Sequence, residues 1–315
     1  MKYGVVLNYN TRNIGDDIQT YAAQKLLPKT DYYLDRENLK NLNIREPVKF
    51  ICNGWYMDNP ENWPPASNFI PLFISFHVTN SNNSYKTLIT KEHYNYYKKF
   101  EPIGCRDTFT LNLFKSLGID AYLSRCLTLT LKNPFSQYER GNEIIVVDPF
   151  MFYLNMKFKN NIIKNLVPKS LHKNIINFSH HQVPYKNIDK RMEYTERLVD
   201  RYAKAHLIIT SRIHAALPAL AMGTPVLFID LGYDSVASRS RFGGLIDLFN
   251  TIDNTNLPFT DGNFFSRIYR KINLSSIYYP IKNFKFNWDN PPKPPESIQD
   301  ISTKIKERVK VFIES

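Results

Sequence analysis

Arg212 and His214 are the residues best suited to chemistry, because they stand where a buried strand runs into a helix in IITSRIHAALPALAMGTP (208–225). Ligands of open α/β sheets bind at the carboxyl ends of strands, and a helix N-terminus suits an anion. Arginine can grip a carboxylate or phosphate with two hydrogen bonds, and histidine can exchange a proton near neutral pH. In the structural alternative, the helix begins at about Ser211, which only caps it, and His214 packs. Arginine in a first helical turn opposes the macrodipole, so the functional interpretation is favoured and Ser211 joins the predicted donor-binding residues.

A second junction of strand and helix holds Arg106 and Asp107, in GCRDTFTLNLFKSLG (104–118). Arg106 is a second candidate ligand for an anion. In the structural alternative, Asp107 caps the helix and Arg106 pairs with some carboxylate. This pattern alone leaves both interpretations open.

Two further segments follow predicted strands. The loop GYDSVASRSRFGG (232–244) carries Arg239 and Arg241, which either close over a phosphate or lie in solvent. The segment SHHQ (179–182) carries His180, a candidate for contact with an acceptor. Two adjacent histidines without further ligands at a fitting spacing do not predict a metal site, so we expect none.

The segment NIGDD (13–17) lies between the first predicted strand and the first predicted helix. Gly15 lets the backbone approach a ligand closely, and Asp16 and Asp17 favour a helix start electrostatically. On the functional interpretation, one carboxylate accepts a hydrogen bond from a sugar hydroxyl or acts as general base, with Asn13 and Gly15 facing the acceptor. The phosphate-loop pattern of glycines and lysine is absent.

Short apolar runs alternate with helical patterns along the chain, which predicts parallel sheets with crossover helices. We expect strands at Tyr3–Leu7, Lys49–Cys52, Phe73–Val78, Ile103–Cys105, Ala121–Leu123, Ile144–Asp148, Ile175–Phe178, Leu207–Thr210 and Val226–Asp230. We expect helices at Asp16–Leu27, Thr108–Leu117, Glu193–Ala205, Ile213–Met222 and Ser297–Ile313. The predicted fold class is α/β, with two doubly wound, Rossmann-like lobes and a cleft between them.

A polar stretch at 133–142, with Pro134 and Gly141, marks the expected boundary between the lobes. We therefore predict an N-terminal, acceptor-side lobe at 1–135 and a C-terminal, donor-side lobe at 136–288. The segment DNPPKPP predicts a stiff linker, so residues 289–315 are expected to be linker and terminal helix.

Composition narrows the class of protein. The chain of 315 residues has a hydrophobic fraction of 43%, which is enough for a core, and a net charge of +12, which favours anionic partners. Its basic residues are scattered and show no nucleic-acid motif, so we expect no nucleic-acid partner. Three cysteines without metal spacing fit a reducing compartment. No apolar run is long enough for a signal peptide or a membrane helix, so we expect a cytoplasmic protein.

Three segments, in this order, resemble the polysaccharide pyruvyl transferase family: NIGDDIQTYAAQKLL (13–27), GCRDTFTLNLFKSLGIDAYLSRCLTLTL (104–131) and ITSRIHAALPALAMGTPVLFID (209–230). The Arg-Ile-His step within its helix is the most specific piece. Many members carry an Asp-Pro-like element after the Arg-Asp helix, where this chain has Ser124, Arg125 and Cys126. The last 70 or so residues match nothing recognisable.

The resemblance implies a GT-B-like fold and transfer of pyruvate from phosphoenolpyruvate, as co-substrate, to a hexose hydroxyl pair, giving a ketal on a surface-polysaccharide precursor. It implies that Arg212 and His214 bind and act on the donor, with Arg106 as a less certain ligand. No further cofactor is expected. The charge is compatible with a lipid-diphosphate-linked acceptor and with peripheral contact at the inner face of the membrane. Two alternatives stay open: a GT-B-type glycosyltransferase that uses a nucleotide sugar, and a non-enzymatic protein that binds anions or polysaccharide.

Overall fold

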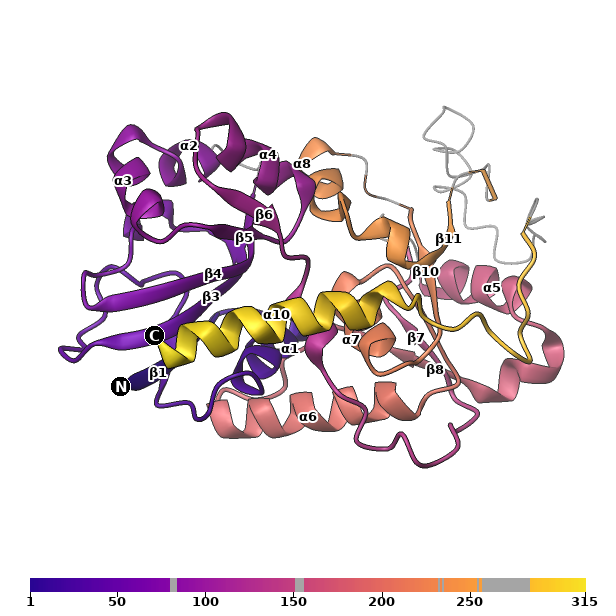
Figure 1. Cartoon of the computed structure of the whole chain (residues 1–315). Helices are drawn as coiled ribbons and strands as arrows, with labels where there is room; N and C mark the ends of the chain where they lie inside the picture. The colour runs from indigo at the N-terminus through magenta and orange to yellow at the C-terminus, as the bar shows by residue number, and fades with distance from the viewer. Residues whose placement is uncertain (80–83, 151–155, 232, 234, 254, 257–283) are drawn as a thin grey trace.

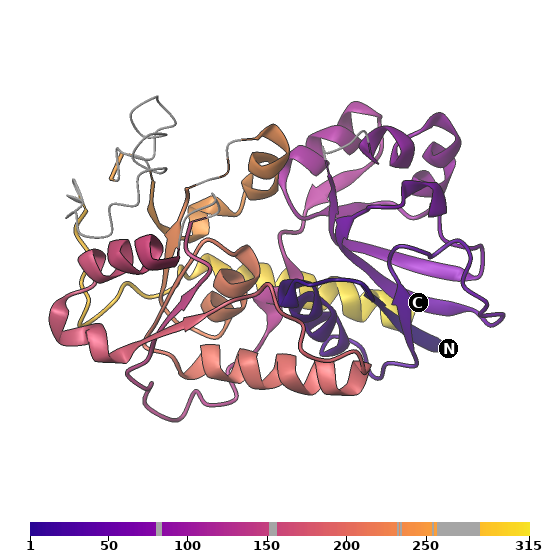
Figure 2. The same ribbon diagram turned by 180° about the vertical axis from the view of Figure 1, so that it is seen from behind.

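Two parallel β-sheets form the framework of the computed structural model, which describes residues 1–79, 84–150, 156–231, 233, 235–253, 255–256 and 284–315 (Figures 1 and 2). In the described part of the chain, the first sheet has the strand order β2-β1-β3-β4-β5-β6. Its strands are β1 (Lys2–Leu7), β2 (Tyr32–Asp35), β3 (Val48–Tyr56), β4 (Phe69–Val78), β5 (Ile103–Cys105) and β6 (Ala121–Leu123). All of their pairings are parallel, so the carboxyl ends of β1, β2 and β3 lie at one edge.

The second sheet has the order β11-β10-β9-β7-β8 and is also parallel throughout its described strands. These strands are β7 (Ile144–Val147), β8 (Ile175–Phe178), β9 (Leu207–Thr210), β10 (Val226–Ile229) and β11 (Asn250–Ile252). The order reverses between β7 and β9, as it does between β1 and β3 in the first sheet. Such switch points are where open α/β sheets bind ligands.

Helices cover both faces of each sheet, because the strands are apolar on both faces. In the first sheet, Val5 and Leu7 pack with α1 (Ile14–Gln24), and Val6 packs with the cluster that holds Tyr97 of α3 (Lys91–Lys99) and Phe114 of α4 (Thr108–Ser116). The short helix α2 (Ser84–Leu88) contacts β4. In the second sheet, one face packs on α5 (Met156–Leu166), and the other packs on α6 (Ile188–Lys204) and α7 (Ile213–Ala221).

One apolar cluster is continuous between the sheets. It joins α1 from the first sheet to α6 and α7 from the second, through the 3₁₀ turn η2 (Leu127–Thr130) and the terminal helix α10 (Ser297–Glu314). Figure 1 shows α10 running alongside both sheets, with its end near β1. There the Lys49 ammonium donates to the carbonyl of Phe312, at 2.8 Å. This apolar cluster contains residues of both sheets and does not mark a boundary between two units. The division into lobes at residue 135 therefore stays a prediction.

The predicted α/β class with parallel sheets is confirmed, and each predicted strand and helix occurs with ends shifted by a few residues. The sequence analysis does not identify β2 or β11, or the helices α2, α3, α5 and α8 (Val236–Arg239). One boundary matters for the site. Helix α7 begins at Ile213 and has Arg212 as its N-cap, so the expectations that Ser211 caps it and that Arg212 lies in its first turn are wrong. Residues 232 and 234 of the predicted loop 232–244, and residues 151–155, 254 and 257–283 of the predicted second lobe, lie outside the described residues.

Candidate active site

A cavity of about 380 Å³ lies at the carboxyl edge of the first sheet, and the start of α7 lines part of its other side. This volume is within the range of about 300–1,000 Å³ that is usual for ligand sites. The β1–α1 loop and the start of α1 contribute Asn8, Asn10, Thr11, Asn13 and Asp16. The ends of β2 and β3 contribute Arg36, Glu37, Trp55, Asp58 and Asn59. The remaining lining residues are Arg106, His214 and Arg241, which we call the cationic wall.

Arg106 is a buried cation whose guanidinium is not fully paired. Its side chain is 1% exposed, and its Nε and Nη2 have no hydrogen-bond partner among the described residues. The nearest carboxylate, Asp107, lies 3.8 Å from Nε and is already bonded to Thr110 and His77. Burial and the neighbouring Arg241 lower the pKa of Arg106. Because a buried charge with unpaired donors is costly, this guanidinium is suited to receive an anion.

His214 lies in the first turn of α7 and is 6% exposed. A Cβ atom on Gly15 would lie 3.1 Å from the His214 Cβ, so the absence of a side chain at Gly15 lets the imidazole pack against α1. The His214 Nε2 has no partner within the described structure, and the same holds for the Nε of Arg241. Burial, Arg106 and Arg241 lower the pKa of His214 well below its ordinary value. The imidazole is therefore neutral at pH 7 in the ligand-free protein.

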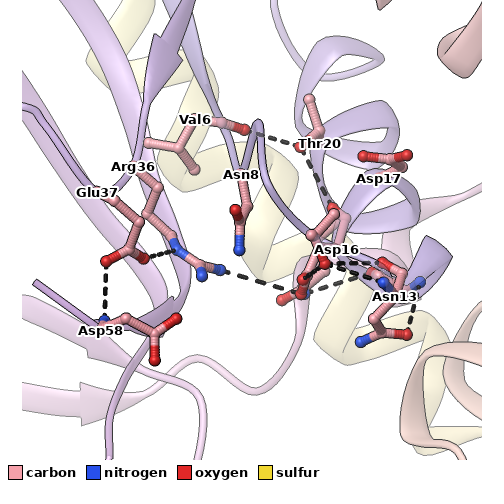
Figure 3. A network of polar contacts seen from close by, with 12 residues as sticks. Val6, Asn8, Asn13, Asp16, Asp17, Thr20, Arg36, Glu37 and Asp58 are labelled. Atoms are coloured by element: carbon pink, nitrogen blue, oxygen red, sulfur yellow. Dashed lines mark hydrogen bonds and ion pairs between the residues drawn. The ribbon is translucent and has the colours of Figure 1, made fainter. Parts of the chain in front are cut away.

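Asp16 faces the cavity from the start of α1, and its neighbours fix its position (Figure 3). The Thr11 hydroxyl donates to its Oδ2 at 2.5 Å, and the Arg36 Nη1 lies 4.0 Å from its Oδ1. Asn13 caps α1 by accepting a hydrogen bond from the Gly15 N–H at 3.1 Å. The predicted segment 13–17 therefore brings Asn13 and Asp16 to the cavity, whereas Gly15 does not line it and packs against His214.

Glu37 organises the opposite part of the lining, which the sequence analysis does not identify. Its Oε2 accepts hydrogen bonds from the backbone N–H groups of Asp58 (2.8 Å) and Asn59 (3.0 Å). Its Oε1 accepts from the Nε of Arg36 at 2.9 Å. Although burial opposes its charge, Asp16 and Glu37 raise the pKa of Arg36. The guanidinium also lies 5.6 Å from the centre of the Trp55 ring, so these residues form one connected network.

Arg212, the leading candidate from the sequence, does not line this cavity. Its Nε donates to Oδ2 of Asp148, 3.1 Å away, and its Nη2 contacts the ring of His181. Asp148 follows β7, which pairs with β9, so this contact arises at the switch point of the second sheet. Arg212 influences the cavity through its charge, since it also lowers the pKa of His214.

Besides Arg212 and Gly15, four predicted site residues lie outside the cavity lining. The hydroxyl of Ser211 is buried and donates to the carbonyl of Ile229. Arg239 pairs with Asp230, with Nη1 at 2.6 Å from Oδ1. His180 is buried with its Nε2 2.7 Å from the Tyr202 hydroxyl, and Asp17 forms a buried ion pair with Arg191. The structure therefore gives these four side chains packing or pairing contacts, and their predicted roles stay untested.

His77 is a buried residue behind Arg106 that the sequence analysis does not select. Its Nδ1 lies 2.5 Å from Oδ2 of Asp107, and burial together with Arg106 lowers its pKa to about 4. The imidazole is thus neutral and donates its Nδ1–H to the carboxylate. Asp107 also caps α4 by accepting from the Thr110 N–H at 2.9 Å. Asp107 thus bonds both the helix start and His77, and it is the negative charge beside the Arg106 guanidinium, 3.8 Å from its Nε.

Two kinds of feature are absent from the described residues. No group of three or more His, Cys, Asp or Glu side chains is arranged to hold a metal ion. Across the same residues, no helix combines the length and the apolar character that a membrane span requires. The expectation that no metal is used stays a prediction.

The fold and the site thus define an α/β protein with a partly cationic cavity where strands end. A family model described as polysaccharide pyruvyl transferase matches residues 13–233, and the chain belongs to this family and is a transferase. No curated protein matches the sequence. A solved structure of an uncharacterized protein from Klebsiella pneumoniae is similar at 13% identity and a TM-score of 0.43, covering 80% of this chain and 92% of that one. We draw no inference from a likeness at that level.

Proposed function

We propose that this protein transfers a pyruvate group from phosphoenolpyruvate to a pair of hexose hydroxyls in a surface-polysaccharide precursor and thereby forms a ketal. The observation that carries the proposal is the set of unpaired donors on the cationic wall: Nε and Nη2 of Arg106, Nε of Arg241 and Nε2 of His214. Phosphoenolpyruvate is small and carries both a phosphate and a carboxylate. The two guanidiniums of the cationic wall match those two groups, and family membership supports the choice of donor.

The reaction needs one proton at the donor carbon and two nucleophilic oxygens. Protonation of the methylene carbon makes the methyl group and leaves cationic character on the central carbon. The first sugar hydroxyl attacks this carbon. Phosphate then leaves with its bridging oxygen, the second hydroxyl attacks, and the ketal ring closes. The two hydroxyl protons balance the proton on the methyl group and the proton on the released hydrogen phosphate.

In this proposal His214 delivers the proton to the methylene carbon. Its imidazole is neutral in the free protein, because burial and the two arginines disfavour its charged form. An anionic donor beside Arg106 and Arg241 reverses that electrostatic effect and raises the pKa of the imidazole. Asp16, held by Thr11 and Arg36, is the candidate base for a sugar hydroxyl.

The same proposal covers the architecture and the partners. The carboxyl edge of the first sheet and the start of α7, both at the cavity, support a GT-B-like arrangement of two lobes. We include phosphoenolpyruvate as co-substrate and no further cofactor. The net charge of +12 supports an acceptor that carries a lipid diphosphate, at the inner face of a membrane.

The test is a transfer assay with phosphoenolpyruvate labelled with ¹³C at its central carbon, and p-nitrophenyl hexopyranosides as acceptors. We expect phosphate release by ³¹P NMR and a new ketal carbon by ¹³C NMR. Arg106→Gln and His214→Gln should each lose at least about 100-fold in rate, while Arg125→Gln, which removes a surface pair with Asp247, should keep it. Near-normal transfer by both site variants would exclude the mechanism. Thermal stabilisation by uridine diphosphate but not by phosphoenolpyruvate would favour a nucleotide-sugar glycosyltransferase instead.

A further inference from the structure

The cavity has a second wall whose charge differs from that of the cationic wall. We call it the acidic wall: Asn8, Arg36, Glu37, Trp55 and Asp58 at the carboxyl ends of β1, β2 and β3, and Asp16 at the start of α1. It carries three carboxylates and one guanidinium, whereas the cationic wall carries two guanidiniums and no carboxylate. One cavity therefore offers two chemically distinct surfaces.

The single guanidinium of the acidic wall is already paired. Arg36 donates to Glu37 at 2.9 Å and lies 4.0 Å from Asp16, and its side chain is only 5% exposed. Arg106, by contrast, has two unpaired donor nitrogens. An incoming anion therefore gains charge-assisted hydrogen bonds on the cationic wall, whereas on the acidic wall it meets excess negative charge.

Polar side chains on the acidic wall are available to neutral hydroxyl groups. In the described structure the Asp58 carboxylate is exposed and has no hydrogen-bond partner, while its backbone N–H is held by Glu37. Figure 3 shows the Asn8 side chain pointing into the space between Arg36 and Asp16. Carboxylates accept hydrogen bonds, and an amide both donates and accepts them, so together they suit a polyhydroxylated ligand.

Trp55 supplies the apolar surface of this wall. It is half-buried at the end of β3, lines the cavity, and has the Arg36 guanidinium 5.6 Å from its ring centre. An indole offers a large apolar area at a low cost in side-chain entropy. The C–H face of a pyranose ring has a matching apolar character.

We propose that the acidic wall is the acceptor subsite, and that it takes an uncharged hexopyranosyl ring and rejects a uronate. The inference rests on the proposed transfer and specifies its acceptor. A uronate would bring a carboxylate toward Asp16 and Asp58, where like charges repel. A neutral ring instead donates hydrogen bonds from its hydroxyls to those carboxylates, and its C–H face packs against the Trp55 ring. The negative charge of the product then comes only from the donor, on the cationic wall.

The experiment compares the binding of neutral and acidic sugars by saturation-transfer difference NMR, with about 5 mM inorganic phosphate present. The neutral sugars are methyl glucopyranoside, galactopyranoside and mannopyranoside. The acidic sugars are the methyl uronosides of glucose and galactose. We expect at least one neutral hexoside to bind at least about tenfold more tightly than either uronoside, since each direct hydrogen bond to a charged group contributes that much. Trp55→Ala should weaken this binding about tenfold, and Trp55→Phe should restore most of it. Asp58→Asn should narrow the difference between neutral and acidic sugars, whereas Asp120→Asn, an exposed carboxylate at β6, should leave it unchanged.

Several results would overturn this subsite. These are tighter or equal binding of the uronosides, unchanged affinities in both Trp55→Ala and Asp58→Asn, or no binding of any neutral hexoside by a protein that binds phosphoenolpyruvate. Failure of the proposed function has a different signature: the wild-type protein shows no affinity for phosphoenolpyruvate, whatever the sugars do. Titration of phosphoenolpyruvate into each variant separates the two cases, because Trp55 and Asp58 do not belong to the cationic wall.

Discussion

Arg191 and Asp17 form a buried ion pair that joins α6 to α1, with the arginine Nε 3.1 Å from the carboxylate Oδ2. Arg191 also donates to the backbone carbonyls of Asn8 (3.1 Å) and Tyr9 (3.4 Å). These contacts hold the β1–α1 loop, which lines the cavity, against a helix of the second sheet. Asp17 therefore helps to position the β1–α1 loop through Arg191, whereas Asp16 faces the cavity.

Removal of one partner of this pair should strongly destabilise the protein. Arg191→Met leaves the Asp17 carboxylate buried without its partner, and such losses cost about 3–5 kcal/mol of unfolding free energy. Urea unfolding monitored by circular dichroism measures this cost. Asp17→Asn should also destabilise, and the double variant should lose less than the sum of the single losses because the sites are coupled.

A surface pair between the same helices provides the control. Lys25 lies 3.0 Å from Glu196, and both side chains are about half exposed. Lys25→Met should change the unfolding free energy by less than about 1 kcal/mol, as is usual for exposed ion pairs. Equal losses in Lys25→Met and Arg191→Met would contradict the role given to the buried pair.

Arg106→Gln should weaken donor binding about 100-fold in a protein that still folds. The substitution removes a buried cation with unpaired donors, but it also removes the charge 3.8 Å from the buried Asp107 carboxylate, so the unfolding free energy should fall by about 1–3 kcal/mol. Affinity for phosphoenolpyruvate should fall about 100-fold, which corresponds to two lost charge-assisted hydrogen bonds. Thermal shift with and without phosphoenolpyruvate measures both quantities. A variant that unfolds easily and still binds the donor would show that Arg106 is structural.

Gly15→Ala should slow the reaction with little effect on stability. The added Cβ would lie 3.1 Å from Cβ of His214 and 3.3 Å from its Nδ1, so the imidazole must shift by a few tenths of an ångström. Alanine favours the helical backbone, which offsets part of this strain. Because small misplacements of a catalytic group are costly, we expect kcat to fall roughly tenfold or more. Unchanged kcat would mean that the position of His214 is not critical.

Stability should fall as pH decreases from 6.5 to about 4. Burial lowers the pKa of His77 to about 4 and that of His180 to about 3. The unfolded chain takes up these protons near pH 6.5, whereas the folded protein cannot, so falling pH favours unfolding. Each histidine contributes a slope of about 1.4 kcal/mol per pH unit. Urea unfolding at pH 7.5, 6.0 and 5.0 measures it, and His77→Gln should remove one such contribution. A flat profile would show that these imidazoles accept protons in the folded state.

The sequence predicts the elements that place Arg106 and His214, because both follow apolar runs that end in clear helix starts. It does not predict Arg36 and Glu37, because they follow β2, a four-residue strand whose pattern YYLD is too short to separate from a loop. Trp55 is visible in the sequence, but the expected strand ends at Cys52. The observed strand continues to Tyr56 through Gly54 at a φ of +99°, which only glycine adopts readily.

The position of Arg212 shows why the local sequence pattern does not predict which residues line the cavity. Its place at a strand end is as expected, but its Nε is bonded to Asp148, which comes from β7. That pairing depends on the strand order of the second sheet, which brings β7 beside β9. Strand order is set by packing over the whole chain, so no short segment near Arg212 reveals it. The same reason hides the contact between His77 and Asp107.

A crystal soaked with phosphoenolpyruvate tests the central claim most directly, because it shows which cations hold the donor. We predict that its phosphate and carboxylate lie within hydrogen-bonding distance of Arg106 and Arg241, with the methylene carbon facing Nε2 of His214. Density for the donor beside Arg212 and His181, away from the cationic wall, would contradict the account.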